Sequence, residues 1–597
     1  MCGIFSLYVY KPYHHNKKGT SSSTLTTAST KESDLSSTVA KLLKSISHRG
    51  RDSVSIFRTT PRHHYQWTRY GKLDDTLLHT LSESIFPLQS ASPPSPITNP
   101  YHPLHNVTLQ HFLSQTRYVT SRAQGNNYDS TTYRKWNDPS DNSNPPPQLL
   151  SQIPPLHLNG FQIAHNGTVD KNQLLVELVK CNPRYKDPLN SKYLTDTQMI
   201  AGLLYYWSIP ENPPNSNKQD FLYNAIKRFV TLFPTAYNLL VFQTTTQRLF
   251  AVRDPLGIRP LTMCIGRDKT PMVCFSSESS SFRHLSDTNT LLTTHELRPG
   301  EIIKVDFNPS TQKFETISTI IQLNPNIHTS STLLPQSCVF EYVYLARPDS
   351  VFNNILINDA RYRMGCCLAR EESRPYHFDP ATTAVACVPR TALPAAKGYA
   401  DTLGLPYYDL LEPVPSVART FLLSNPRERY RLACQKFRVC PPQNPSLQNI
   451  TTWIFVDDSL VRGNTWYAVR ELLDARLPSQ STNYHLRLAC PPIHYPDLMG
   501  IDIPTREELI ANYRLSETPT KKESQDSVSP PFPFPHPPVT LQPPGTPANM
   551  ESLATLCRVD TINYLTKGGV ASTLSGLNPT LPTSNWSMSW HDGCYPK

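Results

Sequence analysis

The chain has 597 residues, which is too long for one ordinary hydrophobic core and predicts two substantial domains with insertions. The formal net charge is +10, yet only 17% of the residues are charged and no long basic run occurs. This mild bias favours small phosphate ligands and argues against nucleic acid as a partner.

The cysteine content and the absence of recognisable export signals indicate in which cellular compartment the protein is expected. Thirteen cysteines are too few for a disulfide scaffold in a chain of this length, and none forms a CxxC pair that could begin a zinc site. The N-terminus lacks the basic region and apolar run of a signal peptide, and no stretch approaches the roughly 18 to 20 apolar residues of a membrane span. We therefore expect a cytoplasmic protein without a membrane partner.

The chain begins MCGIF, so removal of Met1 would leave Cys2 with a free α-amino group. An α-amino group has a pKa of about 8 and can accept the proton of its own thiol. This is the arrangement of N-terminal nucleophile enzymes. The motif alone is weak, because a cysteine at position 2 has no chemical role in most proteins.

Proline-rich segments that also carry Ser, Thr, Asn and His interrupt the first half and recur near the end. The clearest are residues 17–37, 90–103, 126–155 and 518–547, the last containing PPFPFPHPP. Such runs favour an extended polyproline conformation. We interpret them as inserts or spacers, with docking onto an SH3-type groove as the alternative.

Between these inserts the first half contains short apolar runs bounded by turn residues. FQIAHNG, YNLLVFQ and RLFAVRD are the clearest of them. Their length and boundaries predict strands of a buried sheet. The first half is therefore expected to be rich in strands, with a few helices.

Five further motifs follow MCGIF: SHRGRDS, TRYVT, AHNGTVDKNQL, TDTQMI and AVRDPLGIRPL. Their order and approximate spacing resemble the class II glutamine amidotransferase domain. The resemblance implies that the side chain of Asn166 and the backbone N–H of Gly167 stabilise the oxyanion of amide hydrolysis. It also implies that Arg117 binds the glutamine carboxylate and that Asp196 holds the substrate ammonium.

A structural interpretation stands beside the functional one for several of these motifs. The residues at 48–50 and the pair Arg253 and Asp254 could serve as turn and salt-bridge residues, and HNG is a common turn sequence. In the family they resemble, they shape the pocket more than they perform chemistry.

From about Leu334 the pattern changes to alternating strand, loop and helix. TAVACVPRT precedes the helical ALPAAKGYADTLG, and TTWIFVDDSLVRGNT precedes YAVRELLDARL. This alternation predicts a parallel sheet with crossover helices. Asp457 and Asp458 end an apolar run and are followed by small and hydroxylated residues that lead into a helix, which is a favourable place for a phosphate, although an ordinary turn has the same residues.

The blocks CVFEYVYLARPDSVF, VPRTALPAAKGYADTLGLPYY, FVDDSLVRGNTW and ACPPIHYPDLMGIDIPTREELIA resemble amidophosphoribosyltransferases from Cys2 to about Asn512. The resemblance implies an α+β and α/β protein, in which an N-terminal-nucleophile αββα sandwich is followed by a type I phosphoribosyltransferase parallel-sheet domain. It implies glutamine hydrolysis at Cys2 and transfer of the ammonia to phosphoribosyl pyrophosphate, giving 5-phosphoribosylamine for purine biosynthesis. The implied phosphoribosyl-pyrophosphate ligands are Asp457, Asp458, Ser459, Arg462, Gly463, Thr465 and Arg419, and the implied Mg²⁺ positions are Thr391, Asp457 and Asp458.

These comparisons of motifs and composition give an expected domain plan. Residues 2–310 would form the glutamine amidotransferase domain with its inserts, and 330–515 the phosphoribosyltransferase domain. Residues 516–547 would be a proline-rich linker or insert, and 548–597 a C-terminal segment. The resemblance further implies homo-oligomers and feedback inhibition by purine nucleotides.

The second half departs from the family pattern in places that bear on activity. Arg390 stands where an acidic residue is usual, and Pro413 to Ser416 replace a polar loop suited to pyrophosphate. Asn464 replaces a usual Thr, and Trp466 replaces a small residue and would crowd the pocket. The alternative is therefore a diverged non-transferase paralogue that keeps glutaminase activity or only a binding or regulatory role; a glutaminase serving another acceptor is a third possibility.

Some family members hold an iron-sulfur cluster on cysteines of the second half. Cys338 matches one of these ligands, but Asp497 stands at another, and the C-terminal CxxC is absent. We expect no iron-sulfur cluster.

Overall fold

The computed structural model describes the chain in two compact units, Met1–Ser337 and Cys338–Tyr595. The residues it describes are 2–12, 25–46, 49, 53–59, 64–70, 107–117, 132–136, 156–158, 160–187, 194–210, 220–267, 271–285, 291–322, 336–372, 378–414, 430, 434–440, 449–476, 482–501, 503, 505–516 and 536–595.

Two antiparallel sheets form the first unit. The larger has the order β12-β10-β11-β1-β4-β2-β3-β5 and the smaller the order β14-β13-β9-β8-β7-β6. The strands of the larger sheet are β1 Cys2–Pro12, β2 Ser53–Thr59, β3 His64–Tyr70, β4 Val107–Arg117, β5 Thr132–Trp136, β10 Thr262–Gly266, β11 Met272–Ser276 and β12 Leu292–Glu296. Those of the smaller sheet are β6 Leu156–Leu158, β7 Phe161–Gly167, β8 Tyr237–Gln243, β9 Arg248–Arg253, β13 Glu301–Asn308 and β14 Lys313–Ile320.

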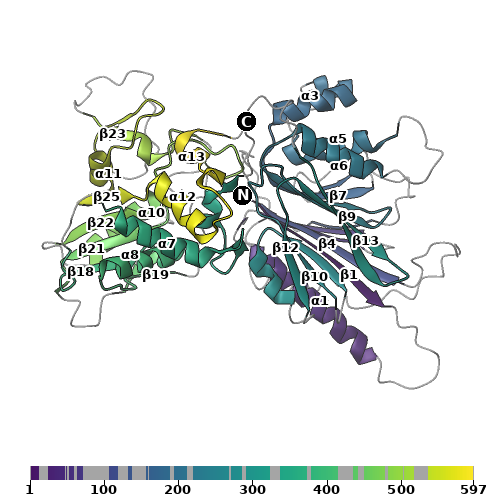
Figure 1. The fold of residues 1–597 in the computed structure, drawn as a ribbon, viewed down its shortest axis with the longest axis horizontal. Coiled ribbons are helices and arrows are strands. Elements are labelled where there is room, and N and C mark those ends of the chain that lie inside the picture. The colour runs from purple at the N-terminus through teal and green to yellow at the C-terminus, as the bar shows by residue number, and fades with distance from the viewer. Residues whose placement is uncertain are drawn as a thin grey trace. The chain divides into compact units, whose positions relative to one another are not determined.

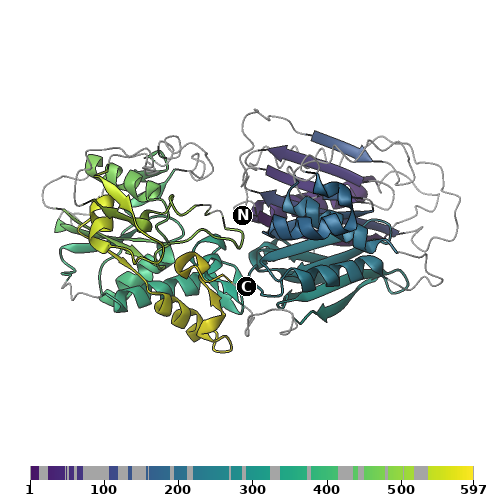
Figure 2. The ribbon, with the colours of Figure 1, turned by 90° about the horizontal axis from the view of Figure 1, so that it is seen from above.

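Helices cover the outer face of each sheet. Helices α3 Lys171–Cys181, α5 Asp196–Ser208 and α6 Phe221–Leu232 pack against the smaller sheet, and α1 Leu25–Ile46 packs against the larger one (Figure 1). Figure 2 looks onto α3, α5 and α6 from above. The αββα sandwich expected from the sequence is therefore confirmed.

Strand β8 shows why the apolar runs of this unit are nearly continuous. Successive side chains of a strand point to opposite faces. Leu239 and Val241 belong to the core beneath the helices, whereas Leu240 and Phe242 belong to the core between the two sheets. Both faces are buried, so both must be apolar.

A parallel sheet of order β18-β21-β22-β25 forms the centre of the second unit. Its strands are β18 Thr383–Cys387, β21 Thr452–Asp457, β22 Asn483–Leu488 and β25 Thr561–Tyr564. Helices α10 Asn464–Arg476 and α11 Met550–Cys557 pack on one face. Helix α8 Leu393–Leu403 packs against β18 and β21, and α7 Ile357–Arg370 packs on α8. The predicted parallel sheet with crossover helices is confirmed.

Segments expected to be inserts or a separate C-terminal piece contribute regular structure. Helix α1 begins inside 17–37, and β24 Val539–Leu541 pairs with β23 Tyr513–Leu515 from within 516–547. The C-terminal segment supplies α11, strand β25 of the parallel sheet, α12 Lys567–Leu577 and α13 Ser589–Asp592. Residues 90–103 lie outside the described part of the chain.

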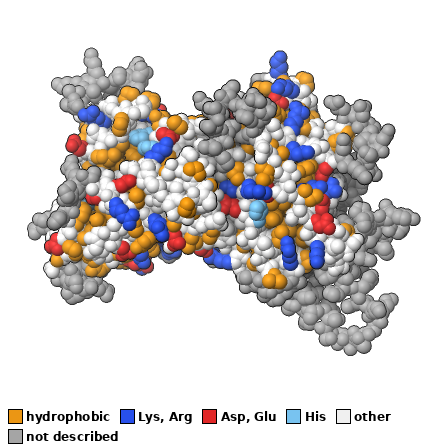
Figure 3. All heavy atoms as spheres, in the orientation of Figure 1, with side chains coloured by type: hydrophobic (Ala, Val, Ile, Leu, Met, Phe, Trp, Pro, Cys, Tyr) orange, Lys and Arg blue, Asp and Glu red, His pale blue; other side chains and the backbone are white. Residues whose placement is uncertain are grey.

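Among the helices of the described residues, none has a stretch that is both long and apolar enough to cross a membrane. On the face drawn in Figure 3, Lys and Arg side chains of the described residues are scattered among acidic and apolar ones. They do not gather into one continuous basic patch on that face.

Candidate functional site

The candidate glutaminase site begins at the first residues of strand β1. Strands β1 and β4 are antiparallel, and their register places Cys2 directly opposite Arg117. Strand β2 pairs with the other edge of β4, where Ser53 lies opposite the same Arg117. The motifs MCGIF, SHRGRDS and TRYVT thus meet at one end of the larger sheet. The side chains of Cys2 and Arg117 lie outside the described part of the structure.

Strand β7 of the smaller sheet ends in Asn166 and Gly167. Asn166 is buried, and Gly167 has φ +147°. A Cβ at Gly167 would lie 2.1 Å from the carbonyl oxygen of Ala236 on the adjoining chain segment. Only glycine fits this close approach of two backbones, so packing requires Gly167 whatever its role in chemistry.

Asp196 is the first residue of helix α5, close to the end of β7. Thr195 caps this helix in a capping box with Gln198. The Nδ1 atom of His165 lies 3.0 Å from Oγ1 of Thr197 and 3.8 Å from a carboxylate oxygen of Asp196. The backbone N–H of Thr197 also donates to the Asp196 carboxylate, at 2.8 Å. His165, which directly precedes Asn166, therefore contacts the start of α5.

A buried turn after β11 makes contacts that the motif analysis missed. Ser277 Oγ accepts hydrogen bonds from Asn166 Nδ2 and from the backbone N–H of Ile4, each at 3.3 Å. The next residue, Glu278, accepts a hydrogen bond from Arg49 Nε at 2.6 Å, and both side chains are buried. The polar run SSES directly after the apolar MVCF was the available signal, but by itself it indicates only a turn.

The motif AVRDPLGIRPL forms a turn held by its own polar groups. The Asp254 carboxylate accepts the backbone N–H groups of Ile258 and Arg259, both at 3.1 Å. Burial raises the pKa of Asp254 to about 6, and the backbone N–H of Arg259 acts in the opposite direction. Arg253 donates to a Glu296 oxygen at 3.0 Å and to the Gly257 carbonyl oxygen at 2.9 Å.

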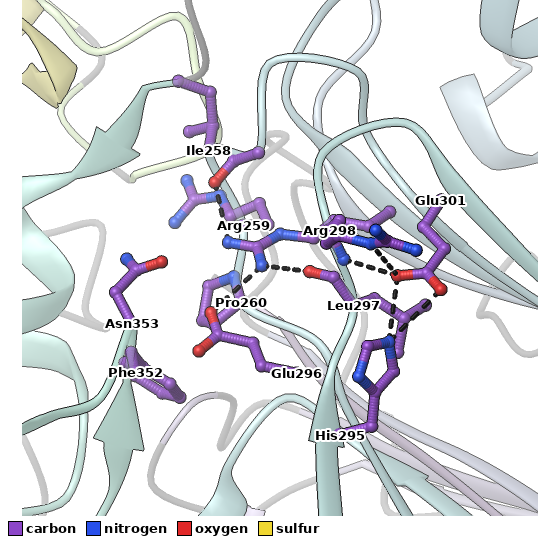
Figure 4. A network of polar contacts seen from close by, with 12 residues as sticks. Ile258, Arg259, Pro260, His295, Glu296, Leu297, Arg298, Glu301, Phe352 and Asn353 are labelled. Atoms are coloured by element: carbon purple, nitrogen blue, oxygen red, sulfur yellow. Dashed lines mark hydrogen bonds and ion pairs between the residues drawn. The ribbon is translucent and has the colours of Figure 1, made fainter. Parts of the chain in front are cut away.

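Beside this turn, Glu301 accepts from His295 Nε2 at 3.0 Å and from the Arg298 backbone N–H at 2.7 Å (Figure 4). Figure 4 also shows Glu296 and Leu297 beside these residues. These contacts are those of turn and salt-bridge residues, which is the structural interpretation given above for Arg253 and Asp254.

In the second unit, the two acidic residues lie at the carboxyl end of strand β21. Asp457 is 7% exposed and Asp458 is 8% exposed. The Asp458 backbone N–H donates to Asp457 Oδ1 at 2.8 Å, and Ser459 Oγ donates to Asp458 Oδ1 at 2.6 Å. Burial, and then the charge of Asp458, raise the pKa of Asp457 well above its usual range, while the charge of Lys436 opposes this.

The loop after these carboxylates leads into helix α10. Gly463 has φ +78°, a conformation that side chains with a Cβ rarely adopt. Thr465 lies in the first turn of α10. The guanidinium of Arg462 pairs with Glu508. Loop and helix N-terminus therefore follow the strand directly, at the edge where open parallel sheets bind ligands.

Thr391 belongs to the loop after strand β18. Strands β18 and β21 are parallel, with Cys387 opposite Val456, so this loop leaves the same edge of the sheet as Asp457. Arg390 is exposed, and the Pro389–Arg390 peptide bond is cis. Pro413 ends strand β19 Leu411–Pro413, whereas Arg419 lies outside the described residues.

The expectation that Trp466 crowds the pocket is wrong. The indole is 1% exposed, packs edge to face on Phe455 with ring centroids 5.3 Å apart, and donates its N–H to the Cys557 carbonyl oxygen. A large apolar ring gains more from this core than from a polar loop. Trp466 therefore points into the core that α10 shares with the sheet.

Cys338 and Asp497 stand at positions that hold iron-sulfur ligands in some family members. Cys338 is buried at the start of the second unit. Asp497 accepts the backbone N–H groups of Met499 and Ile501, at 2.9 and 2.6 Å, and so fixes the following turn. Within the described residues, no group of three or more His, Cys, Asp or Glu side chains is arranged to hold a metal ion.

Comparisons with known proteins fit this architecture. No family model matches the chain. Curated amidophosphoribosyltransferases from mouse, human and Pyrococcus horikoshii are 36%, 37% and 34% identical to it over 363, 369 and 388 residues. The alignments cover 59%, 59% and 64% of this chain and 62%, 62% and 74% of those proteins. The chain thus spans about three fifths of the mammalian relatives it matches.

Solved structures show the same fold. The glutamine phosphoribosylpyrophosphate amidotransferase of B. subtilis, complexed with ADP and GMP, has a TM-score of 0.60 and is 21% identical, with 100% of this chain and 97% of that chain covered. A structure described as the allosteric regulatory enzyme of purine biosynthesis has the same TM-score and identity, with 96% of that chain covered.

Proposed function

Because the chain belongs to the amidophosphoribosyltransferase family, we propose that it hydrolyses glutamine at Cys2 and transfers the ammonia to phosphoribosyl pyrophosphate. The products are glutamate, pyrophosphate and 5-phosphoribosylamine, for purine biosynthesis. The main structural support is the backbone register of Cys2 with Arg117, in a sandwich where Asn166 and Asp196 are linked through His165.

In the first unit, the thiol of Cys2 gives its proton to its own α-amino group and attacks the glutamine carboxamide. The Asn166 amide and the Gly167 backbone N–H stabilise the oxyanion, each such donor being worth about 100- to 1,000-fold in rate. Ammonia leaves, and water then hydrolyses the thioester to glutamate. Arg117 binds the substrate carboxylate and Asp196 its ammonium group.

In the second unit, Asp457 and Asp458 contact the ribose hydroxyls of phosphoribosyl pyrophosphate. The amides and side chains of the following loop, Ser459, Arg462, Gly463 and Thr465, bind its phosphate. Arg419 is a further ligand of phosphoribosyl pyrophosphate in this proposal. Ammonia displaces pyrophosphate at the anomeric carbon.

Mg²⁺ fits the donors at this edge. Burial, and then the charge of the neighbouring Asp458, raise the pKa of Asp457. A divalent cation, which prefers oxygen ligands, would offset the repulsion between the two carboxylates. Thr391, Asp457 and Asp458 are the residues that would hold it. When bound, the ion neutralises charge on the pyrophosphate.

The wider setting follows from the same proposal. We place the enzyme in the cytoplasm as a homo-oligomer inhibited by purine nucleotides. The B. subtilis structure that shares the fold is described as a complex with ADP and GMP, which supports nucleotide regulation.

The proposal is tested by measuring glutamate and pyrophosphate release from purified protein, with and without phosphoribosyl pyrophosphate. Both products are expected when both substrates are present. Glutamate without pyrophosphate would reject the transferase and favour the diverged paralogue or another ammonia acceptor, and silence in both assays would leave only a binding role.

Two cysteine variants test whether Cys2 is the nucleophile. Cys2→Ala should abolish glutamine use and leave ammonia-dependent pyrophosphate release intact. Cys181→Ala, at the end of α3 in the same unit, is the matched control and should leave both activities unchanged. Glutaminase activity persisting in Cys2→Ala would contradict the role of Cys2.

A further inference from the structure

The turn after strand β11 buries an unusual number of polar side chains. Ser276, Ser277, Glu278 and Ser281 are each 0% exposed. Burial of polar groups costs free energy unless each is hydrogen-bonded. The contacts of these side chains therefore indicate what the turn does.

Ser277 is bonded to both sides of the candidate glutaminase site. Its backbone N–H donates to the Ile4 carbonyl oxygen at 3.1 Å, and its Oγ accepts the Ile4 N–H at 3.3 Å. The same Oγ accepts Nδ2 of Asn166 at 3.3 Å. Ile4 lies two residues beyond Cys2 on β1, so one hydroxyl joins the strand of the nucleophile to the side chain of the oxyanion donor.

The other polar side chains of the turn are hydrogen-bonded too. The Ser281 hydroxyl donates to Ser276 Oγ at 2.8 Å, and the Glu278 backbone N–H donates to the same Ser276 oxygen at 3.1 Å. Glu278 pairs with Arg49 from the SHRGRDS motif. The turn thus contacts three of the motifs, at Ile4, Arg49 and Asn166, and hydrogen-bonded buried networks of this kind are rigid.

We propose that Ser277 is a positioning residue of the glutaminase site, which fixes the Asn166 amide relative to the start of β1. The inference rests on the proposed glutamine hydrolysis at Cys2. A side-chain amide has two N–H groups. Ser277 takes one of them and so orients the amide, which leaves the second N–H to meet the oxyanion.

The first test compares Ser277→Ala with Ser281→Ala by steady-state glutamate release. Loss of a whole oxyanion donor costs about 100- to 1,000-fold, so a misplaced donor in Ser277→Ala should lower kcat about 10- to 100-fold. KM for glutamine should change by less than about threefold, because the oxyanion forms only in the transition state and not in the bound substrate. Ser281→Ala removes a buried hydroxyl from the same turn without touching Asn166 and should keep kcat near wild type.

The second test measures Ser277→Ala in an Asn166→Ala background. A residue that acts through Asn166 should cause no further loss of kcat there. The proposal would be overturned if Ser277→Ala lowered kcat by the same factor in both backgrounds, or if Ser281→Ala lowered kcat as much as Ser277→Ala. It would also be overturned if Ser277→Ala kept the kcat of an active wild-type protein. A wild-type protein without glutaminase activity would instead reject the proposed function.

A third test, with two further variants of Ser277, covers the case in which Ser277→Ala does not fold. Ser277→Thr keeps the hydroxyl, and Ser277→Val has the same shape without it. Both add the same methyl group, so packing strain is matched, and the Thr variant should retain kcat well above the Val variant. Equal kcat values for the two would contradict the proposal.

Discussion

Trp466, in the first turn of α10, donates its indole N–H to the carbonyl oxygen of Cys557 at 2.9 Å. These residues are 91 positions apart, and the hydrogen bond joins α10 to the end of α11 inside the core of the second unit. The bulky residue that departs from the family pattern is therefore accommodated by packing in this core.

Trp466→Phe should destabilise the second unit with little effect on substrate binding. The change leaves the Cys557 carbonyl oxygen without this donor, at a cost of about 1 to 3 kcal/mol. Denaturant unfolding measures the loss. Trp590→Phe is the matched control, because Trp590 is equally buried and its indole N–H has no hydrogen-bond partner within the described chain. Equal losses in the two variants would argue against a role for the hydrogen bond.

Asp196→Asn should raise KM for glutamine by about 10- to 100-fold, since a charged hydrogen bond is worth about 1.5 to 3 kcal/mol. The amide keeps the size of the side chain but removes the negative charge that the proposed function assigns to binding the substrate ammonium. Glutamate release at varied glutamine concentration measures the change. Asp170→Asn, which alters the N-cap of the neighbouring helix α3, should leave KM as it is. A similar rise in both variants would point to helix capping instead of substrate binding.

Gly167→Ala should prevent the end of β7 from forming its native contacts. The added Cβ would lie 2.1 Å from a backbone oxygen, and a backbone atom cannot move away cheaply. We expect loss of stability and of glutaminase activity together. Gly576→Ala, in helix α12 with nothing within 4 Å of the added Cβ, should instead stabilise by about 0.5 to 1 kcal/mol. Thermal unfolding of the two variants distinguishes the cases.

His485 should make the stability of the second unit fall in mild acid. Burial, and then the charge of Arg487, lower the pKa of His485 from 6.5 to about 4, while Asp560 and Glu372 act in the opposite direction. Below pH 6.5 the unfolded chain takes up a proton that the folded chain does not, so stability is present above 6.5 and is lost as the pH falls towards 4.

Denaturant unfolding at several pH values between 4 and 7 measures this dependence. The contribution of His485 is at most about 1.4 kcal/mol per pH unit. His485→Gln keeps a polar side chain near Thr561, which the imidazole Nδ1 contacts at 2.7 Å, and should flatten the slope. An unchanged slope would show that other groups carry the acid sensitivity.

The sequence by itself determined the features that depend on neighbouring residues. The apolar runs FQIAHNG and YNLLVFQ predicted strands because burial on both faces demands apolar residues along the whole strand. Alternating strand and helix patterns likewise predicted the parallel sheet and placed Asp457 at its carboxyl edge. The family motifs gave the order of the site along the chain, and the register of Cys2 with Arg117 is consistent with that order.

The tertiary structure alone decided the contacts between residues far apart in the chain. Ser277 lies 111 residues from Asn166 and 273 from Ile4, so no local pattern relates them. The prediction for Trp466 was wrong for the same reason, since its hydrogen-bond partner in the core, Cys557, belongs to α11. Local sequence fixes which groups a segment offers, but only packing fixes which distant group satisfies each buried donor and acceptor.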